Sequence, residues 1–244
     1  MPSTARTGEL SIVIATCNRA TTLLESLGKL VLLPQRPPIV VVDNGSSDAT
    51  IEAVRRAHPG VRTIALGRNI GAAARSVGAR AVDTPYVAFC DDDCWWAPGS
   101  LRRAAALLDA YSEVAVLNAR VLVGDEERLD EACRAMALSD LPKVTECPGR
   151  PIGAFMAGAA VVRREAFLAA GGYHRRYHIG AEESLLALDL LAAGWQLVYD
   201  PELVLHHHPS AAARDPFERR RLVLRNRLWT KWLRHSAGCG LAST

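Results

Sequence analysis

The chain has 244 residues, and its 29 Lys and Arg residues exceed its 26 Asp and Glu residues by a net charge of +3. This excess is too small to indicate a nucleic-acid partner, and none is expected. At about 100–200 residues per domain, the length fits one large domain or two small ones. With 49% hydrophobic and 23% charged residues, the composition is that of a globular protein and excludes a disordered chain.

Neither a membrane span nor a secretion signal is expected. The longest uncharged apolar stretch, residues 152–162, contains glycines and is shorter than the ~20 residues that a spanning helix needs. The apolar run that ends at Ala15 is too short for a signal peptide, and no cleavage site follows it. The six cysteines form no CxxC pair, which is typical of reduced thiols. The sequence therefore predicts a cytoplasmic protein.

The first 120 residues alternate short β-branched runs with helical patterns. Strands are expected over residues 10–15, 39–42, 61–66 and 86–90. Helices are expected over residues 20–33, from a cap at Ser47 or Asp48 to about residue 57, and over 72–82. Strands that are apolar on both faces and alternate with helices predict an α/β fold with a mostly parallel central sheet flanked by helices.

The second part of the chain is less regular. Helices are expected over residues 100–110, 164–170 and 182–193, and strands over 114–123, 154–162 and 195–199. The polar segment 124–151 reads as a variable excursion, and residues 214–234 alternate Arg with Leu, Val and Trp in a basic C-terminal helix. Because no linker or internal repeat interrupts the chain, residues 1–244 are expected to form a single domain.

Three adjacent carboxylates, Asp91, Asp92 and Asp93, directly follow the predicted strand YVAFC. Their mutual repulsion needs an offset, and oxygen ligands at the carboxyl end of a parallel strand suit Mg²⁺ or Mn²⁺. A solvated acidic turn is the simpler alternative. A strand followed by this DxD motif also begins Asp-nucleophile phosphatases, with Asp91 as the nucleophile, although their pattern has Thr or Val where this chain has Trp95.

Several motifs occur in a characteristic order: TCNR at 16–19, VVDNGSSD at 41–48, RNIGAAAR at 68–75, FCDDD at 89–93, the acidic pair at 182–183, and HHHP at 206–209. Together they resemble family 2 glycosyltransferases of the GT-A fold, a group of nucleotide-diphospho-sugar transferases, over residues of about 9 to 230. The resemblance implies a nucleotide-sugar-binding half over 9–120, an acceptor half over 121–213 and a basic helix over 214–235. It also implies an inverting transfer from a UDP- or dTDP-sugar to an acceptor hydroxyl.

The resemblance assigns the first donor contacts. Thr16 and Arg19 match positions that line the nucleotide, and Cys17 replaces an aromatic residue that many members carry. Asp43 matches the acid that accepts a hydrogen bond from a uracil-type ring, a role that suits an acceptor-only carboxylate. The alternative for Asp43 is an ordinary turn residue in DNGSSD, since Asp and Asn favour such turns.

The resemblance also assigns the diphosphate and metal positions. Arg75 resembles an arginine that contacts the donor or the aspartates, and a surface Arg is its alternative. Asp91 and Asp92 match the nucleoside side, whereas Asp93 matches the ligand of Mg²⁺ or Mn²⁺. His207 resembles a further metal or diphosphate ligand, although a cluster of exposed histidines is equally consistent with the sequence.

On the acceptor side, Glu183 occupies the position of the general base that deprotonates the acceptor hydroxyl, where the family usually has Asp. Glu182 is the other candidate, and two acids favoured by a helix N-terminus are the simpler reading. Gly158 falls where the sugar or acceptor meets the protein. Trp95 is a candidate to stack on a sugar face, and a place in the core is its alternative. The departures at Cys17 and Glu183 keep a second hypothesis open, a degenerate fold that binds without catalysis.

The expected acceptor is a glycan, a lipid-linked sugar or a small molecule. The basic helix over 214–234 fits peripheral contact with the inner face of an anionic membrane, and an ordinary solvated face is its alternative. A sugar nucleotidyltransferase is disfavoured, because the glycine-rich loop expected after the first strand is absent.

Overall fold

The computed structural model describes residues 9–209 and 216–234. The leader over 1–8, the tail over 235–244, and residues 214 and 235 at the predicted bounds of the basic helix lie outside the described residues. The described strands are β1 (Leu10–Thr16), β2 (Ile39–Asp43), β3 (Arg62–Ala65), β4 (Tyr86–Asp91), β5 (Cys94–Trp96), β6 (Val114–Val123), β7 (Arg128–Leu129), β8 (Arg150–Pro151), β9 (Ala160–Arg163) and β10 (Gln196–His207). The described helices are α1 (Ala20–Leu30), α2 (Thr50–Ala57), α3 (Ala73–Arg80), α4 (Ser100–Ala110), α5 (Glu131–Ala137), α6 (Arg164–Ala169), the 3₁₀ turn η1 (Arg175–Tyr177), α7 (Glu182–Ala192) and α8 (Pro216–Arg234).

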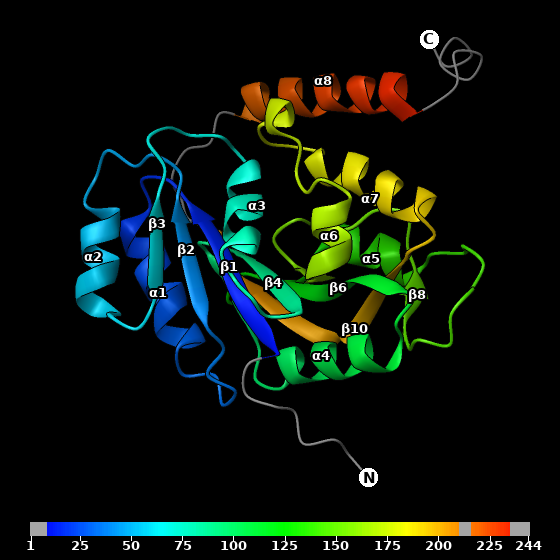
Figure 1. The fold of residues 1–244 in the computed structure, drawn as a ribbon, viewed down its shortest axis with the longest axis horizontal. Coiled ribbons are helices and arrows are strands. Elements are labelled where there is room, and N and C mark those ends of the chain that lie inside the picture. Colours follow the sequence, from blue (N-terminus) through cyan, green and yellow to red (C-terminus); the bar gives the residue numbers. More distant parts are fainter. Residues whose placement is uncertain (1–8, 210–215, 235–244) are drawn as a thin grey trace.

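The strands form one sheet in the order β3-β2-β1-β4-β9-β6-β10-β5, with β7 on β6 and β8 on β10. β3, β2, β1 and β4 run parallel, β9 lies antiparallel between β4 and β6, and β10 runs parallel to β6. Helices flank this sheet, which confirms the predicted α/β class (Figure 1). In the register, Thr16 lies opposite Asp43 and Ala15 opposite Asp91. The carboxyl ends of β1, β2 and β4 therefore meet at one edge.

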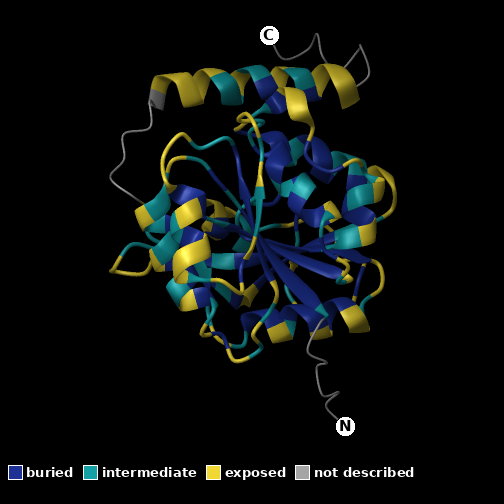
Figure 2. Ribbon diagram, turned by 60° about the vertical axis from the view of Figure 1, so that its left-hand side comes forward, coloured by how far each residue is buried: buried dark blue, intermediate teal, exposed yellow. Residues whose placement is uncertain are grey.

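The core lies along the central strands, which are buried while the helices expose their outer sides (Figure 2). Val13, Val42 and Phe89 are fully buried because these strands are apolar on both faces. Gly78 lets α3 approach the sheet, since a Cβ there would lie 2.3 Å from Cγ1 of Val13. This close packing fixes α3, and with it Arg75, against β1, which is the neighbour of β4 and its acidic triplet.

Several predicted boundaries were wrong. The first helix ends at Leu30 and the chain turns before Pro34. The strand predicted over 154–162 is confined to Ala160–Arg163, because Asn118 Oδ1 accepts a hydrogen bond from the Met156 backbone and the next residues turn. The excursion contains β7, α5 and β8. The N-cap of α2 is Ala49, and Asp48 instead accepts a hydrogen bond from the backbone N–H of Thr50 at 3.0 Å.

No strand was predicted directly after the acidic triplet, where the structure has an edge strand of the sheet. β5 forms directly after the triplet and pairs antiparallel with β10. β10 extends well past the predicted end at Tyr199 and includes His206 and His207. Among the described residues, no helix combines the length and apolarity needed to cross a bilayer.

Candidate active site

The three aspartates at the end of β4 have different partners. Thr16 Oγ1 donates a hydrogen bond to Asp92 Oδ2 at 2.8 Å. Arg19 bridges two of the carboxylates, with its Nε 3.0 Å from Asp92 Oδ1 and an Nη 2.9 Å from Asp93 Oδ2. Asp91 instead pairs with Arg75. The predicted residues Thr16 and Arg19 therefore contact the triplet itself.

Asp92 and Asp93 are both buried, with 6% and 2% of their surfaces exposed. Burial raises the pKa of Asp92 to about 6, while Arg19 and the hydrogen bond from Thr16 act in the opposite direction. Its backbone carbonyl accepts a hydrogen bond from Ser26 at 3.0 Å. These contacts make Asp92 the residue that anchors the turn and holds Arg19.

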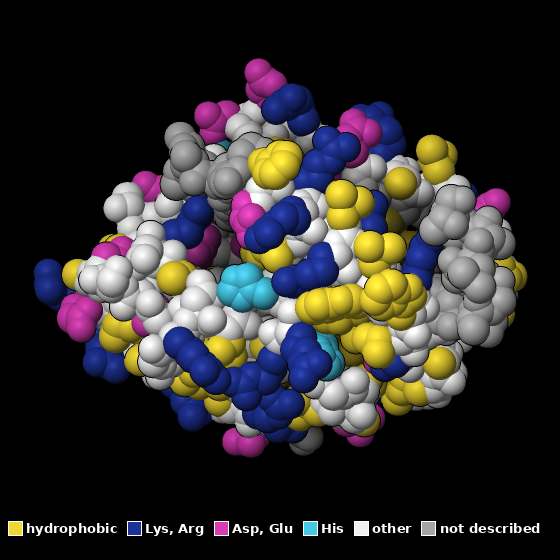
Figure 3. All heavy atoms as spheres, turned by 90° about the horizontal axis from the view of Figure 1, so that it is seen from above, with side chains coloured by type: hydrophobic (Ala, Val, Ile, Leu, Met, Phe, Trp, Pro, Cys, Tyr) yellow, Lys and Arg dark blue, Asp and Glu magenta, His cyan; other side chains and the backbone are white. Residues whose placement is uncertain are grey.

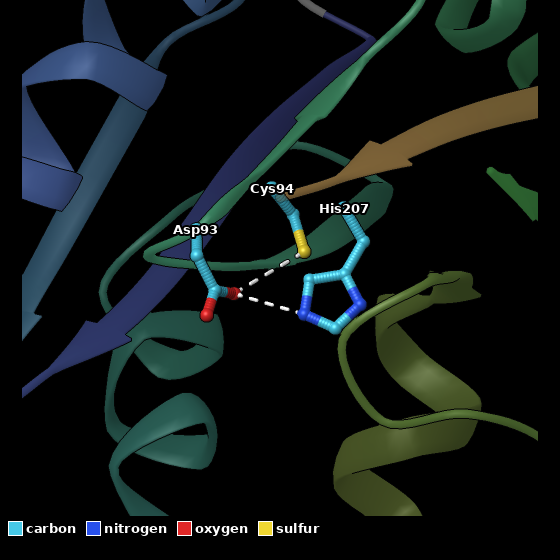
Figure 4. A group of neighbouring side chains, drawn as sticks. All are labelled: Asp93, Cys94 and His207. Atoms are coloured by element: carbon cyan, nitrogen blue, oxygen red, sulfur yellow. Dashed lines mark hydrogen bonds and ion pairs between the residues drawn. The ribbon is translucent and has the colours of Figure 1, made fainter. Parts of the chain in front are cut away.

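Asp93, Cys94 and His207 bring their side chains together at the start of β5 (Figure 4). Their potential ligand atoms all lie within 4.8 Å of one another. Asp93 Oδ1 is 3.5 Å from both the His207 Nε2 and the Cys94 Sγ. Cys94 pairs with His207 across β5 and β10, so both side chains lie on the same face of the sheet.

This cluster suits a divalent cation. A carboxylate oxygen and an imidazole nitrogen are ligands that Mn²⁺ accepts, whereas Mg²⁺ prefers oxygen alone. Burial holds the pKa of Cys94 well above its usual value, and nearby carboxylates add to this effect, so the sulfur stays a thiol at neutral pH. Asp93 and His207 are therefore the two residues here that fit as ligands. Asp93 offers Oδ1, because Arg19 holds Oδ2.

Asp91 faces outward, with 39% of its side chain exposed. Gly158 lies directly against it, since a Cβ at this glycine would lie 2.5 Å from the carboxylate. Gly158, predicted to line the sugar pocket, therefore lies in direct contact with Asp91, predicted to contact the donor. The glycine provides the space that the carboxylate occupies.

Changing Gly158 to Ala is expected to displace the Asp91 carboxylate and to weaken donor binding several-fold. Gly153→Ala is the matched control, because the nearest atom to its added Cβ would be the Leu141 side chain at 3.8 Å. Calorimetric titration of both variants with UDP and Mn²⁺ measures the effect. Equal affinities in the two variants would show that Asp91 does not contact the donor.

The acidic pair at the start of α7 lies near Arg75. Glu182 is 5% exposed, whereas Glu183 is half-buried. Burial raises the pKa of Glu183 to about 7 with the neighbouring charge of Glu182, and Arg75 and Arg219 act in the opposite direction. Since Arg75 also pairs with Asp91, one guanidinium links the acidic pair to the triplet.

One nitrogen of this guanidinium and two buried oxygen atoms near it have no hydrogen-bond partner among the described residues. They are Arg75 Nε, Tyr173 Oη and Glu182 Oε2. Buried polar groups are paired in the large majority of cases, so this cluster has room for a polar ligand or an ordered water. Sequence reasoning missed Tyr173, and no pattern in the sequence singles it out. It also missed Cys94, whose position next to the triplet was the available signal.

Two predicted residues lie apart from this centre. Asp43 is 4% exposed and accepts a hydrogen bond from the Ser46 backbone at 3.2 Å, beside a pocket of about 290 Å³ that Ile51 and Leu66 also line. Trp95 points to the opposite side of β5 from Cys94. Its ring stacks on His206 with centroids 5.4 Å apart. The structure therefore does not bring Trp95 to the cluster of Asp93.

Known proteins with similar sequences or folds include sugar transferases. The chain is 30% identical to the N-acetylglucosaminyl-diphospho-decaprenol L-rhamnosyltransferase of Mycobacterium tuberculosis over 86% of this chain and 80% of that protein. Staphylococcus aureus TarS 1–349 in complex with UDP-GlcNAc superposes with a TM-score of 0.67 at 19% identity, covering 95% of this chain and 68% of that one. The mannosyltransferase PcManGT of Pyrobaculum calidifontis, in complex with GDP-Man and Mn²⁺, gives 0.64 at 19% identity, covering 95% and 66%.

The sheet order and these superpositions define a GT-A type nucleotide-diphospho-sugar transferase fold. The model of glycosyl transferase family 2 matches residues 11–169, and the chain belongs to this family. It is a glycosyltransferase that uses a nucleotide-sugar donor. The chain spans 46% of the longer TarS structure, so the activities of such larger proteins do not transfer to it directly.

Proposed function

We propose that this protein is an inverting, metal-dependent glycosyltransferase that moves a sugar from a UDP- or dTDP-sugar to an acceptor hydroxyl. The observation that carries the proposal is the arrangement around Arg75. This residue pairs with Asp91, two residues before Asp93 of the candidate metal cluster, and its charge lowers the pKa of Glu183 at the start of α7. A donor held at the triplet would therefore place its sugar next to a carboxylate base.

In this proposal Glu183 accepts the proton of the acceptor hydroxyl as its oxygen attacks the anomeric carbon from the side opposite the diphosphate. A pKa of about 7 suits a base that works near neutral pH. Asp93 and His207 would hold Mn²⁺ or Mg²⁺, which supplies Lewis-acid stabilisation of the departing diphosphate. Arg75 would bind the donor or orient Asp91, and Thr16, Arg19 and Asp92 would keep the turn in place.

Donor selection is proposed to begin at Asp43. Its carboxylate accepts hydrogen bonds only, so it can read the ring N–H of uracil or thymine and not cytosine, which lacks that hydrogen. The M. tuberculosis relative is named for rhamnosyl transfer to N-acetylglucosaminyl-diphospho-decaprenol. By analogy, we propose a lipid-diphosphate-linked sugar as the acceptor of this chain. The cytoplasmic location remains a prediction.

A thermal-shift series with UDP, dTDP and CDP, each with and without Mn²⁺, tests the donor assignment. UDP or dTDP at 100 times its Kd should add about 2.7 kcal/mol of stability to the folded state. CDP should add much less, and Mn²⁺ should strengthen the response to the two preferred nucleotides. Equal shifts with all three nucleotides would refute the role of Asp43, and no shift with any of them would refute the proposed donor class.

A further inference from the structure

The hydrophobic side of α8 faces solvent. Three of its residues at helical spacing, Leu224, Leu228 and Trp232, are 54%, 53% and 75% exposed. Phe217 extends the same stripe by two turns and is also exposed. Asn226, on the opposite side of the helix, is fully buried. A surface helix normally keeps its solvent-facing side polar, whereas α8 exposes a hydrophobic stripe in addition to the Val223 and Trp229 side chains that contact the protein.

Cationic side chains accompany this hydrophobic stripe. Helix α8 carries seven Lys and Arg residues and a single acid, Glu218. From the helical period, Arg220, Arg227 and Lys231 follow one border of the stripe and Arg221 lies within it. In the view onto this face, hydrophobic side chains lie next to Lys and Arg side chains (Figure 3). The surface is thus hydrophobic and positively charged at once.

The inner side of α8 is held against η1 and α7 by specific contacts. Asn226 Nδ2 donates to the carbonyl oxygens of Tyr177 at 2.8 Å and Gly180 at 2.6 Å. The Thr230 hydroxyl lies 2.9 Å from the Tyr177 hydroxyl, and Arg234 pairs with Asp189. These contacts fix the rotation of the helix, so its hydrophobic stripe stays directed outward.

We propose that the outer side of α8 is a docking surface for an anionic lipid bilayer. Its hydrophobic residues would enter the boundary between headgroups and acyl chains, while the flanking Lys and Arg side chains bind the anionic headgroups. Charge complementarity selects this occupant. Pairing with a second copy of the same helix would bring the four cations on and beside the stripe, Arg220, Arg221, Arg227 and Lys231, against the same four of the other copy.

The docking surface is connected to the acidic pair. Gly180, which receives the Asn226 hydrogen bond, precedes Glu182 by two residues. Its approach to α8 is close, since a Cβ there would lie 2.7 Å from Cγ2 of Val223. The bilayer would therefore lie on the side of the molecule that carries α7. This inference rests on the proposed function in one respect, because docking on the bilayer would bring the active site to a lipid-linked acceptor.

Vesicle flotation of the full chain tests the inference, with phosphatidylglycerol-containing vesicles compared with pure phosphatidylcholine vesicles. The wild type should bind the anionic vesicles and not the neutral ones. The variant L224S/L228S/W232S should bind at least tenfold more weakly. The control L32S/L138S removes two leucines that are 80% and 79% exposed elsewhere, and it should bind like the wild type.

Circular dichroism and UDP affinity measured on the same samples show that each variant is folded. Failure of the wild type to bind anionic vesicles would overturn the inference, as would equal binding by the triple variant. A dimer in light scattering that this variant converts to a monomer would assign the stripe to self-association and overturn it as well. Vesicle binding without sugar transfer would support the docking surface and refute the proposed activity, so the two failures are distinguishable.

Discussion

Replacing Glu183 with Gln is expected to abolish sugar transfer while donor binding is retained. Gln keeps the size and the hydrogen-bonding shape of the side chain but cannot take up a proton at neutral pH. Loss of a general base typically costs about 10²–10⁴-fold in rate. The value of kcat measures the loss, and calorimetric titration with UDP and Mn²⁺ checks that the Kd changes little.

Glu182→Gln is the matched variant, because it makes the same change one residue earlier. Its effect on kcat is expected to be smaller, since Glu182 is 5% exposed and more enclosed than Glu183. Removing the negative charge of Glu182 should also lower the pKa of Glu183, because that charge helps to raise it. Normal transfer by the Glu183 variant together with an inactive Glu182 variant would move the base to Glu182.

The pH dependence of the wild type provides an independent test of the base. The pKa of Glu183 is raised to about 7, chiefly by burial, so the carboxyl is mostly protonated below that pH. Only the carboxylate accepts a proton, and kcat/KM should therefore rise tenfold per pH unit below about 7 and level off above it. A flat profile across this range would contradict the assignment.

Replacing Asp93 with Asn is the second change with a large expected effect. Asn retains the shape but removes the charge that faces His207 and pairs with Arg19. We expect Mn²⁺ affinity and sugar transfer both to fall by at least about 100-fold, since electrostatic stabilisation of the leaving group is usually the largest catalytic contribution. Titration with Mn²⁺ and transfer assays with and without a chelator measure the two losses.

Cys94→Ser is the control for this prediction. Because the buried thiol of Cys94 is protonated at neutral pH, it does not act as a thiolate ligand, and the serine variant should retain Mn²⁺ binding. Full transfer by the wild type in the presence of chelator, or by the Asp93 variant, would refute the metal role. Loss of Mn²⁺ binding in the Cys94 variant would instead make the sulfur a ligand.

The nucleotide-binding half was predictable because its signals are local. β1, β2 and β4 are short and apolar on both faces, and a helical pattern directly follows β1 and β2. The motif order then supplied the family, which the comparisons confirm. The roles assigned to individual residues remain predictions. The structure does bring Thr16 and Arg19 to Asp92 across more than 70 residues of sequence.

The contacts that were missed depend on pairing between distant strands. The register of β5 on β10 places Cys94 and His207 on one side and Trp95 and His206 on the other, and no local pattern encodes that register. The orientation of the Trp95 side chain follows from this register. Tyr173 lies between α6 and η1, where only the packing of α3 against the loop brings its hydroxyl near Arg75.

The measurement that tests the central claim most directly is transfer itself. The chain is incubated with Mn²⁺, a panel of UDP- and dTDP-sugars that includes dTDP-L-rhamnose, and a polyprenyl-diphosphate-linked N-acetylglucosamine. Nucleoside diphosphate release, product mass and the anomeric configuration of the product are followed. The account predicts one nucleoside diphosphate per sugar added and an inverted anomeric centre. Tight binding of the nucleotide without turnover of any donor would contradict it and identify a non-catalytic binding subunit.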